Sequence, residues 1–293
     1  MKRFIPFKLK QLFKDLLKKR KFNRFEKSAT HLTYDILVEQ FINSGVKKGD
    51  ILFVHSSLKG LGYIENGAKD IIDALKTVIT DQGTLIFPTF TINGSMYDTL
   101  NDTNHMFDPK SSPSTVGAIT NHFRTSKDIF RSLHPTHSVA AWGKYAKHIT
   151  ASHHDLNTNF GQETPFGKFL ELNGKLVGLG IDYAHVTFYH VYEDLNLDKF
   201  PKVYLPEAIN TKILNHQGEE LKCQTLCHNS DFHKTRIDKD PKIEKFFREY
   251  FEKNDVSVTT QIGDGHLWWM HTKDLIEHLD ILHKKNKTIF KIN

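Results

Sequence analysis

The stretch Gly49-Asp50-Ile51-Leu52-Phe53-Val54 decides the fold of this chain. A turn of glycine and aspartate leads into four apolar residues, and a short apolar run bounded by turn residues is typical of a strand buried on both faces. His55-Ser56-Ser57-Leu58 follows at the carboxyl end of this strand. Because ligand sites of open α/β sheets gather where strands end, we expect a binding site at these four residues.

The elements around this strand predict a βαβ unit. Apolar side chains recur at helical spacing between residues 66 and 79, and residues 84–90 form a second apolar run that Pro88 stops. A helix capped by Thr33 is expected before the first strand. Residues 91–114 are polar and rich in Asn, Asp, Ser and Pro, and a segment of this length indicates a functional loop.

The second half of the chain continues this α/β pattern and adds a hairpin. A third buried strand is expected at 175–181, and a turn at 215–218 within 211–226 predicts a β-hairpin. The fold class predicted is α/β, with a central, mostly parallel sheet flanked by helices and a smaller antiparallel subdomain in the C-terminal half. The subdomain is expected to combine the hairpin with strands at 256–262 and 267–270, and further helices are expected at 114–124, 165–172, 241–253 and 272–284.

The first 27 residues form a basic arm. They hold eleven Lys and Arg against Asp15 and Glu26, a net charge of +9, so the rest of the chain carries −3 of the total of +6. Apolar residues recur among the lysines at near-helical spacing, which suits an amphipathic helix on an anionic membrane surface. A helix packed against its own domain accounts for the pattern equally well. We therefore divide the chain into an arm, 1–28, and a domain, 29–293, and expect no nucleic-acid partner because the domain lacks a basic patch with interleaved aromatics.

Several classes of protein are excluded by what the sequence lacks. It has no apolar run of membrane-spanning length and no signal peptide pattern, so we expect a cytoplasmic protein, with peripheral attachment through the arm as an option. The two cysteines, Cys223 and Cys227, form neither a CxxC motif nor a bridge framework. Dinucleotide, P-loop and GxSxG signatures are missing. None of the close histidine pairs has the spacing of a structural zinc site, so no metal is expected.

Two polar segments are candidates for chemistry. Arg131-Ser132-Leu133-His134-Pro135-Thr136-His137-Ser138 is too polar for an ordinary core and is either a solvated loop or the wall of a site. His190 and Glu193 lie one helical turn apart, so the carboxylate can orient the ring of a general base. An inert surface pair has the same spacing, and from periodicity alone both interpretations stay open.

Six motifs that occur in a characteristic order along the chain favour the functional interpretation of both segments. Together they resemble the aminoglycoside 3-N-acetyltransferase family, also called antibiotic N-acetyltransferases, over about residues 32–260. The motifs are Gly49 to Leu58, Gly83-Thr84-Leu85-Ile86-Phe87-Pro88-Thr89, Phe107-Asp108-Pro109, Ser114 to Ile119, Arg131 to Ser138, and Lys175 to Gly180 followed by the helix with His190 and Glu193.

The resemblance implies an acetyl-CoA-dependent transfer to an amine. It implies that His190 is the general base and that Glu193 orients it or holds a cationic substrate. The residues that it places along the CoA channel are His55, Ser56, Ser57, Leu58, Arg131, Ser132, His134 and Ser138. Those expected to contact the acceptor are Asp108, Thr187, Cys227 and His228.

The sequence departs from the family where a polycationic acceptor would be held. Members that modify aminoglycosides carry a glutamate in the region that here contains Cys227 and His228, and acidic residues in the loop before Asp108, where this chain is less acidic. The acceptor is therefore expected to be an amino sugar of one of two kinds: a nucleotide-linked sugar of surface polysaccharide synthesis, or the 3-amino group of an aminoglycoside. A non-catalytic membrane-associated or partner-binding module on the same fold is the alternative.

Overall fold

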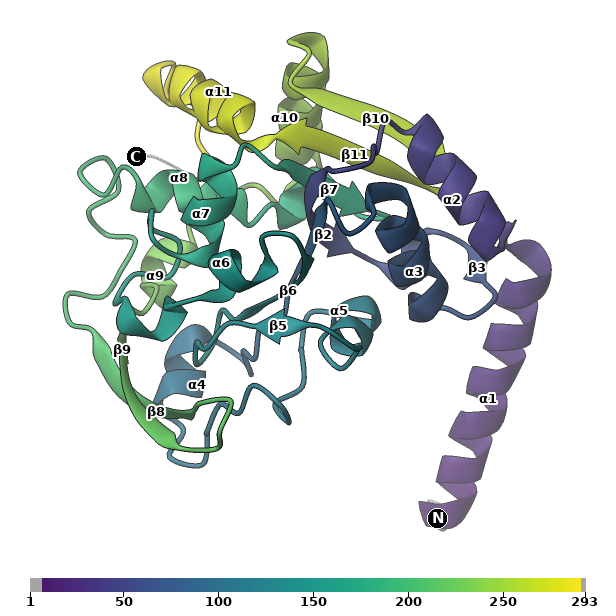
Figure 1. Ribbon diagram of the computed structural model, residues 1–293, viewed down its shortest axis with the longest axis horizontal. Helices are drawn as coiled ribbons and strands as arrows, with labels where there is room; N and C mark the ends of the chain where they lie inside the picture. The colour runs from purple at the N-terminus through teal and green to yellow at the C-terminus, as the bar shows by residue number, and fades with distance from the viewer. Residues whose placement is uncertain (1–6, 291–293) are drawn as a thin grey trace, which may run out of the picture.

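A seven-stranded mixed sheet forms the centre of the protein (Figure 1). The computed structural model describes residues 7–290. In the order β10-β11-β7-β2-β4-β6-β5, the three central strands β7, β2 and β4 are parallel, and the outer strands are antiparallel to their neighbours. The strands are β2 (Ile51–Ser56), β4 (Thr84–Pro88), β5 (Phe130–Arg131), β6 (Val139–Gly143), β7 (Lys175–Leu179), β10 (Ser257–Ile262) and β11 (Gly265–His271).

Helices cover both faces of this sheet because side chains alternate along the buried strands. Phe53 of β2 belongs to a core cluster on one face, and its neighbours Leu52 and Val54 belong to a cluster on the other. The first face is covered by α6 (Ala146–Thr150), α7 (Pro165–Glu171), α8 (Phe188–Asp194), α10 (Pro241–Lys253) and α11 (Thr272–Lys284). The second is covered by α2 (Tyr34–Asn43), α3 (Ala68–Ile79) and α5 (Ala118–Phe123). The predicted α/β class and the βαβ unit β2-α3-β4 are confirmed.

The expected antiparallel subdomain is smaller than predicted. Only the hairpin of β8 (Ile209–Leu214) and β9 (Glu220–Thr225) forms a separate sheet of this kind, and β10 and β11 extend the main sheet instead. β11 pairs with β7 so that Trp268 lies opposite Gly178. A Cβ at Gly178 would come within 2.0 Å of the Trp268 indole. The glycine thus makes room for a buried tryptophan, and this fit fixes β11 beside the central strands.

The predicted functional loop contains a helix of its own, α4 (Met96–Asn101). Ser95 caps it through a reciprocal pair of hydrogen bonds with Asp98. The helix predicted to start at Ser114 begins at Ala118 instead, since the Thr115 amide bonds to the carbonyl of Phe90 and holds this segment in an extended path. The remaining short elements are β1 (His31–Leu32), β3 (Tyr63–Ile64), α9 (Ser230–His233) and 3-10 turns at Leu58–Gly60, His153–Asp155 and Tyr183–His185.

The N-terminal arm is a helix, α1 (Phe7–Ser28), that projects from the domain (Figure 1). Leu12, Phe13, Leu16 and Leu17 are 63, 64, 53 and 42% exposed. The interpretation that these four side chains pack against the domain is therefore wrong. Phe4 and Ile5, two further apolar residues of the arm, lie outside the described residues. Across residues 7–290, no helix is both long and apolar enough to cross a bilayer.

Candidate active site

A cavity of about 520 Å³ opens at the carboxyl ends of the parallel strands. Phe90, shortly after β4, and the segment that follows β7 both border it, so the site lies at the edge of the sheet where the strand pattern places it. Its apolar walls come from Phe90, Ile92, Met96, Phe160, Ala184 and Val186. Its polar lining includes four histidines, His137, His190, His228 and His233, and three basic residues, Lys234, Arg236 and Lys239.

His190 lies on the cavity wall in a defined protonation state. Its Nδ1 is 2.8 Å from Oε2 of Glu193, and its Nε2 is 2.8 Å from Nη1 of Arg236. A guanidinium can only donate hydrogen bonds, so Nε2 accepts and the ring proton sits on Nδ1, which donates to Glu193. The residue pair predicted from helical spacing is thus a buried pair with a fixed tautomer.

Burial favours the neutral form of the imidazole. His190 is 8% and Glu193 is 1% exposed. Desolvation, reinforced by the charge of Arg236, lowers the pKa of His190 to about 3. Desolvation also pushes the pKa of Glu193 upward, while the charge of Arg236 opposes this shift and favours the carboxylate. The ring is therefore a neutral acceptor at physiological pH, as a general base requires.

A second layer of charged residues supports this pair. Arg236 forms an ion pair with Asp238, which is 1% exposed. Asp194 accepts hydrogen bonds from Thr158, from the Phe160 amide and from the Tyr204 hydroxyl. Sequence reasoning missed Arg236, Asp238 and His233, because 46 residues separate Arg236 from His190 and no local periodicity links them.

Of the four residues expected to contact the acceptor, Thr187 and His228 line this cavity. Cys227 is fully buried in a separate apolar cluster with Met96 and Leu100, where desolvation raises its pKa to about 11. Asp108 accepts hydrogen bonds from Ser111 and from the Lys110 amide in a turn away from this lining. Cys227 and Asp108 therefore have no part in the function proposed below.

The segment Arg131–Ser138 is a buried hydrogen-bond network rather than a solvated loop. Nε, Nη1 and Nη2 of Arg131 all donate within the protein, to hydroxyls of Thr89 and Ser138 and to the carbonyls of Thr89, Pro109 and Ser112. The Ser132 hydroxyl pairs with His153 and accepts from the amide of Val139.

His134 and Ser138 are also committed to this network. Nδ1 of His134 accepts from two backbone amides, and the Ser138 hydroxyl donates to the Thr89 carbonyl. From this segment, His137 lines the cavity. The segment thus supports the site from behind, and direct contacts of Arg131, Ser132, His134 and Ser138 with CoA are not part of the function proposed below.

The residues at the carboxyl end of β2 and just after it, where a binding site is predicted, also lie apart from the cavity lining; β2 continues through His55 and Ser56 instead of ending at Val54. His55 is buried with its ring 5.4 Å from that of Phe53. Leu58 packs against the second core cluster. Ser57 borders a different hollow of about 470 Å³ that Gly180 and Asp264 share. The Ser56 hydroxyl is buried without a hydrogen-bond partner among the described residues, which leaves it free for a bound group.

Fold and site together define an α/β protein with a neutral, carboxylate-oriented histidine on the wall of a mixed hydrophobic and basic cavity. The chain belongs to the aminoglycoside 3-N-acetyltransferase family, whose model matches residues 53–282. The family resemblance predicted from the six motifs is thereby confirmed.

Curated relatives share about 30% identity with this chain. The aminoglycoside N(3')-acetyltransferase-like protein YokD of Bacillus subtilis, derived from the SPbeta prophage, is 30% identical over 176 residues, which are 55% of this chain and 64% of that protein. An aminoglycoside N(3)-acetyltransferase III of Salmonella is 31% identical over 175 residues, 55% of this chain and 60% of that protein. The matched region thus spans less than two thirds of these relatives.

Solved structures share the fold at lower identity. The aminoglycoside acetyltransferase AAC(3)-Xa superposes with a TM-score of 0.73 at 19% identity, covering 89% of this chain and 95% of that one. AAC-IIIb, solved as a binary complex with CoASH, gives 0.71 at 19% identity, covering 90% and 100%. AAC-VIa bound to sisomicin gives 0.71 at 21% identity, covering 87% and 99%.

Proposed function

We propose that the protein is an acetyl-CoA-dependent N-acetyltransferase that acts on the amine of an amino sugar. The observation that carries this proposal is the buried His190–Glu193 pair on the wall of the 520 Å³ cavity. Curated relatives are named as aminoglycoside acetyltransferases, and one structural neighbour was solved with CoASH. The cavity suits such a donor, because its apolar walls fit an alkyl amide chain.

The residues of this chain contribute a proton transfer to the reaction. Acetyl-CoA supplies the activated acyl group as a thioester. The amine nitrogen forms a bond to the carbonyl carbon, the carbon–sulfur bond breaks, and the thiol leaves. Nε2 of His190 takes the proton that the nitrogen loses, and Glu193 keeps the ring in the required tautomer and stabilises the imidazolium. The proton then passes from Nε2 of His190 to the departing sulfur. Arg236 occupies Nε2 in this structure, so the amine takes the place of Arg236 when it binds.

The charge of the cavity favours an anionic acceptor. In the described part of the chain, none of the residues that line the cavity is acidic, whereas Lys234, Arg236 and Lys239 are basic. Asp231 pairs with Lys234 and Asp238 pairs with Arg236, and the exposed Lys239 has no ion-pair partner among the described residues. An aminoglycoside is a polycation that needs acidic walls. A nucleotide-linked amino sugar brings phosphates that these side chains can hold.

A thiol-release assay with acetyl-CoA and a panel of acceptors tests the proposal. The panel contains nucleotide-linked amino sugars and aminoglycosides, each at matched concentration. We expect thiol release with at least one amino sugar, and a higher kcat/KM for the nucleotide-linked class. Release with neither class, combined with CoA binding, would support the non-catalytic alternative and overturn the enzyme assignment.

The exposed helix α1 supports a second, peripheral role. We propose that it lies on an anionic membrane surface, because Leu12, Phe13, Leu16 and Leu17 are exposed on a helix rich in lysine and arginine. Sedimentation with vesicles of anionic lipid, and of neutral lipid as a control, tests this. We expect the full chain to bind the anionic vesicles and a Leu12→Ser/Leu16→Ser variant, which keeps the charge of the helix, to lose binding with unchanged turnover in solution. Equal binding by both proteins would refute the role.

A further inference from the structure

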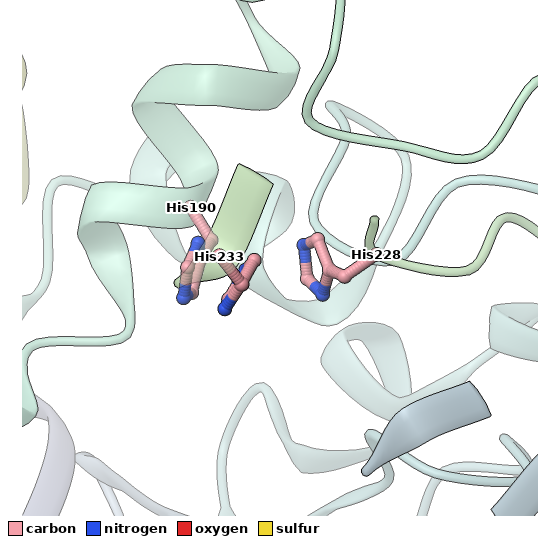
Figure 2. A group of neighbouring side chains, drawn as sticks. All are labelled: His190, His228 and His233. Atoms are coloured by element: carbon pink, nitrogen blue, oxygen red, sulfur yellow. The ribbon is translucent and has the colours of Figure 1, made fainter. Parts of the chain in front are cut away.

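Three imidazoles from separate segments converge on one side of the cavity (Figure 2). His190 comes from α8, His228 precedes α9, and His233 ends α9. One ring nitrogen of each lies within 4.8 Å of those of the other two. Their ring centroids are 4.7 to 5.2 Å apart.

Two of these rings have a ring nitrogen without a partner. Nε2 of His228 and Nε2 of His233 are buried and have no hydrogen-bond partner among the described residues. His228 is 8% exposed and stacks on the ring of Tyr204, which fixes its plane. A buried polar atom without a partner destabilises the protein, so this part of the cavity suits a ligand that satisfies ring nitrogens.

We propose that His190, His228 and His233 form a binding site for a divalent transition metal ion, Zn²⁺ in the first instance. Imidazole nitrogen is a preferred ligand of Zn²⁺, and three histidines with one open position are a common set for this ion. Bonds of about 2.0–2.1 Å place tetrahedral ligands about 3.3 Å apart. The three nitrogens lie within 4.8 Å of one another, so metal binding shortens each distance by about 1.5 Å at most. Rotation of the side chains is enough for this movement.

Two carboxylates behind the three rings offset part of the positive charge of the cavity. Nδ1 of His190 donates to Glu193, the carboxylate–histidine arrangement that orients metal ligands. Oε1 of Glu193 is itself buried without a hydrogen-bond partner among the described residues. Asp238 lies in the same network through its pair with Arg236. The fourth position of the ion faces the cavity and is open to water or a solute.

Arg236 is the built-in competitor of this ion. Its Nη1 lies 2.8 Å from Nε2 of His190, the atom that the metal needs, and its charge repels a dication. The ion and the guanidinium therefore occupy Nε2 of His190 as alternatives. If His190 is the base of the proposed transfer, the bound ion also removes the proton acceptor, and Zn²⁺ inhibits acetylation. Only this last consequence rests on the proposed function.

Binding of Co²⁺ to the full chain, stripped of metal and free of acetyl-CoA, tests the site directly. Visible absorption reports tetrahedral Co²⁺, and Zn²⁺ should displace it. We expect one equivalent to bind to the wild type. His228→Gln and His233→Gln should each weaken binding at least tenfold, while Arg236→Ala should strengthen it. His148→Ala, which removes an exposed histidine on α6, is the matched control and should leave binding unchanged.

The outcomes separate cleanly from those of the thiol-release assay. Absence of one-equivalent binding in both the wild type and Arg236→Ala overturns the metal site and leaves the transferase proposal as it was. Binding that persists in both glutamine variants, each checked for native circular dichroism, also overturns it. One-equivalent binding with the expected pattern in a protein that shows no turnover supports the metal site and refutes the transferase proposal alone.

Discussion

Arg131 and Arg236 show two uses of a guanidinium in one molecule. Arg131 is 3% exposed, and it donates to backbone carbonyls and hydroxyls of its own loop network. Arg236 borders the cavity and donates to the ring nitrogen of His190 and to Asp238. Both arginines belong to polar clusters rich in histidine. The difference lies in what each guanidinium binds: Nε, Nη1 and Nη2 of Arg131 donate to oxygens of the surrounding loops, whereas Arg236 donates to a ring nitrogen on the wall of an open cavity. An arginine surrounded by backbone and hydroxyl acceptors stabilises a fold, and one that borders a cavity can exchange its partner for a ligand.

The largest effect is expected at His190, the proposed base. His190→Ala should lower the turnover rate by roughly 10² to 10⁴, because the amine then loses its proton acceptor. Thiol release at saturating acetyl-CoA measures this rate, and His148→Ala serves as the control. A rate within twofold of the wild type would remove His190 from the mechanism.

Substitution of Arg131 should change the stability of the protein rather than its turnover rate. Arg131→Met leaves several buried carbonyls without donors and should lower the free energy of unfolding by about 3 kcal/mol. Denaturant unfolding measures the loss, and kcat per folded molecule should stay near that of the wild type. A large fall in kcat or a raised KM for acetyl-CoA, with unchanged stability, would show that Arg131 serves the site directly.

Substitution of Glu193, which bonds to Nδ1 of His190, should have an intermediate effect on kcat. Glu193→Gln keeps an oxygen that accepts from Nδ1 of His190 but removes the charge that stabilises the imidazolium, so kcat should fall by about 10- to 100-fold. The KM for the acceptor should change little. A raised KM for cationic acceptors with unchanged kcat would mean that Glu193 binds substrate rather than orienting His190.

The smallest effect is expected at the cavity rim. Lys239→Glu reverses one exposed charge and should raise the KM of a nucleotide-linked acceptor by about 5- to 10-fold at low salt. The same change should leave stability unaltered, and Lys147→Glu on α6, remote from the cavity lining, is the matched control. A lower KM for the anionic acceptor would contradict the charge assignment of the cavity.

By itself the sequence determined the elements whose signal is local. The buried strands β2, β4 and β7 follow from short apolar runs, and α10 and α11 match their predicted residues because caps and periodicity act within a few turns. The pairing of His190 with Glu193 was also predictable, since residues three apart on a helix are neighbours.

Only the tertiary structure decided the contacts between distant segments. The place of β11 depends on Trp268 fitting over Gly178 across the sheet, and the approach of Arg236 to His190 depends on how α9 and the segment after it pack against α8. The meeting of His228 and His233 with His190 likewise has no counterpart in sequence spacing. Local periodicity fixes which side chains share a face, but the packing of one face against another follows from the shape and volume of the whole core. For that reason the pairing of His190 with Glu193 could be predicted from sequence, and the approach of Arg236, His228 and His233 to His190 could not.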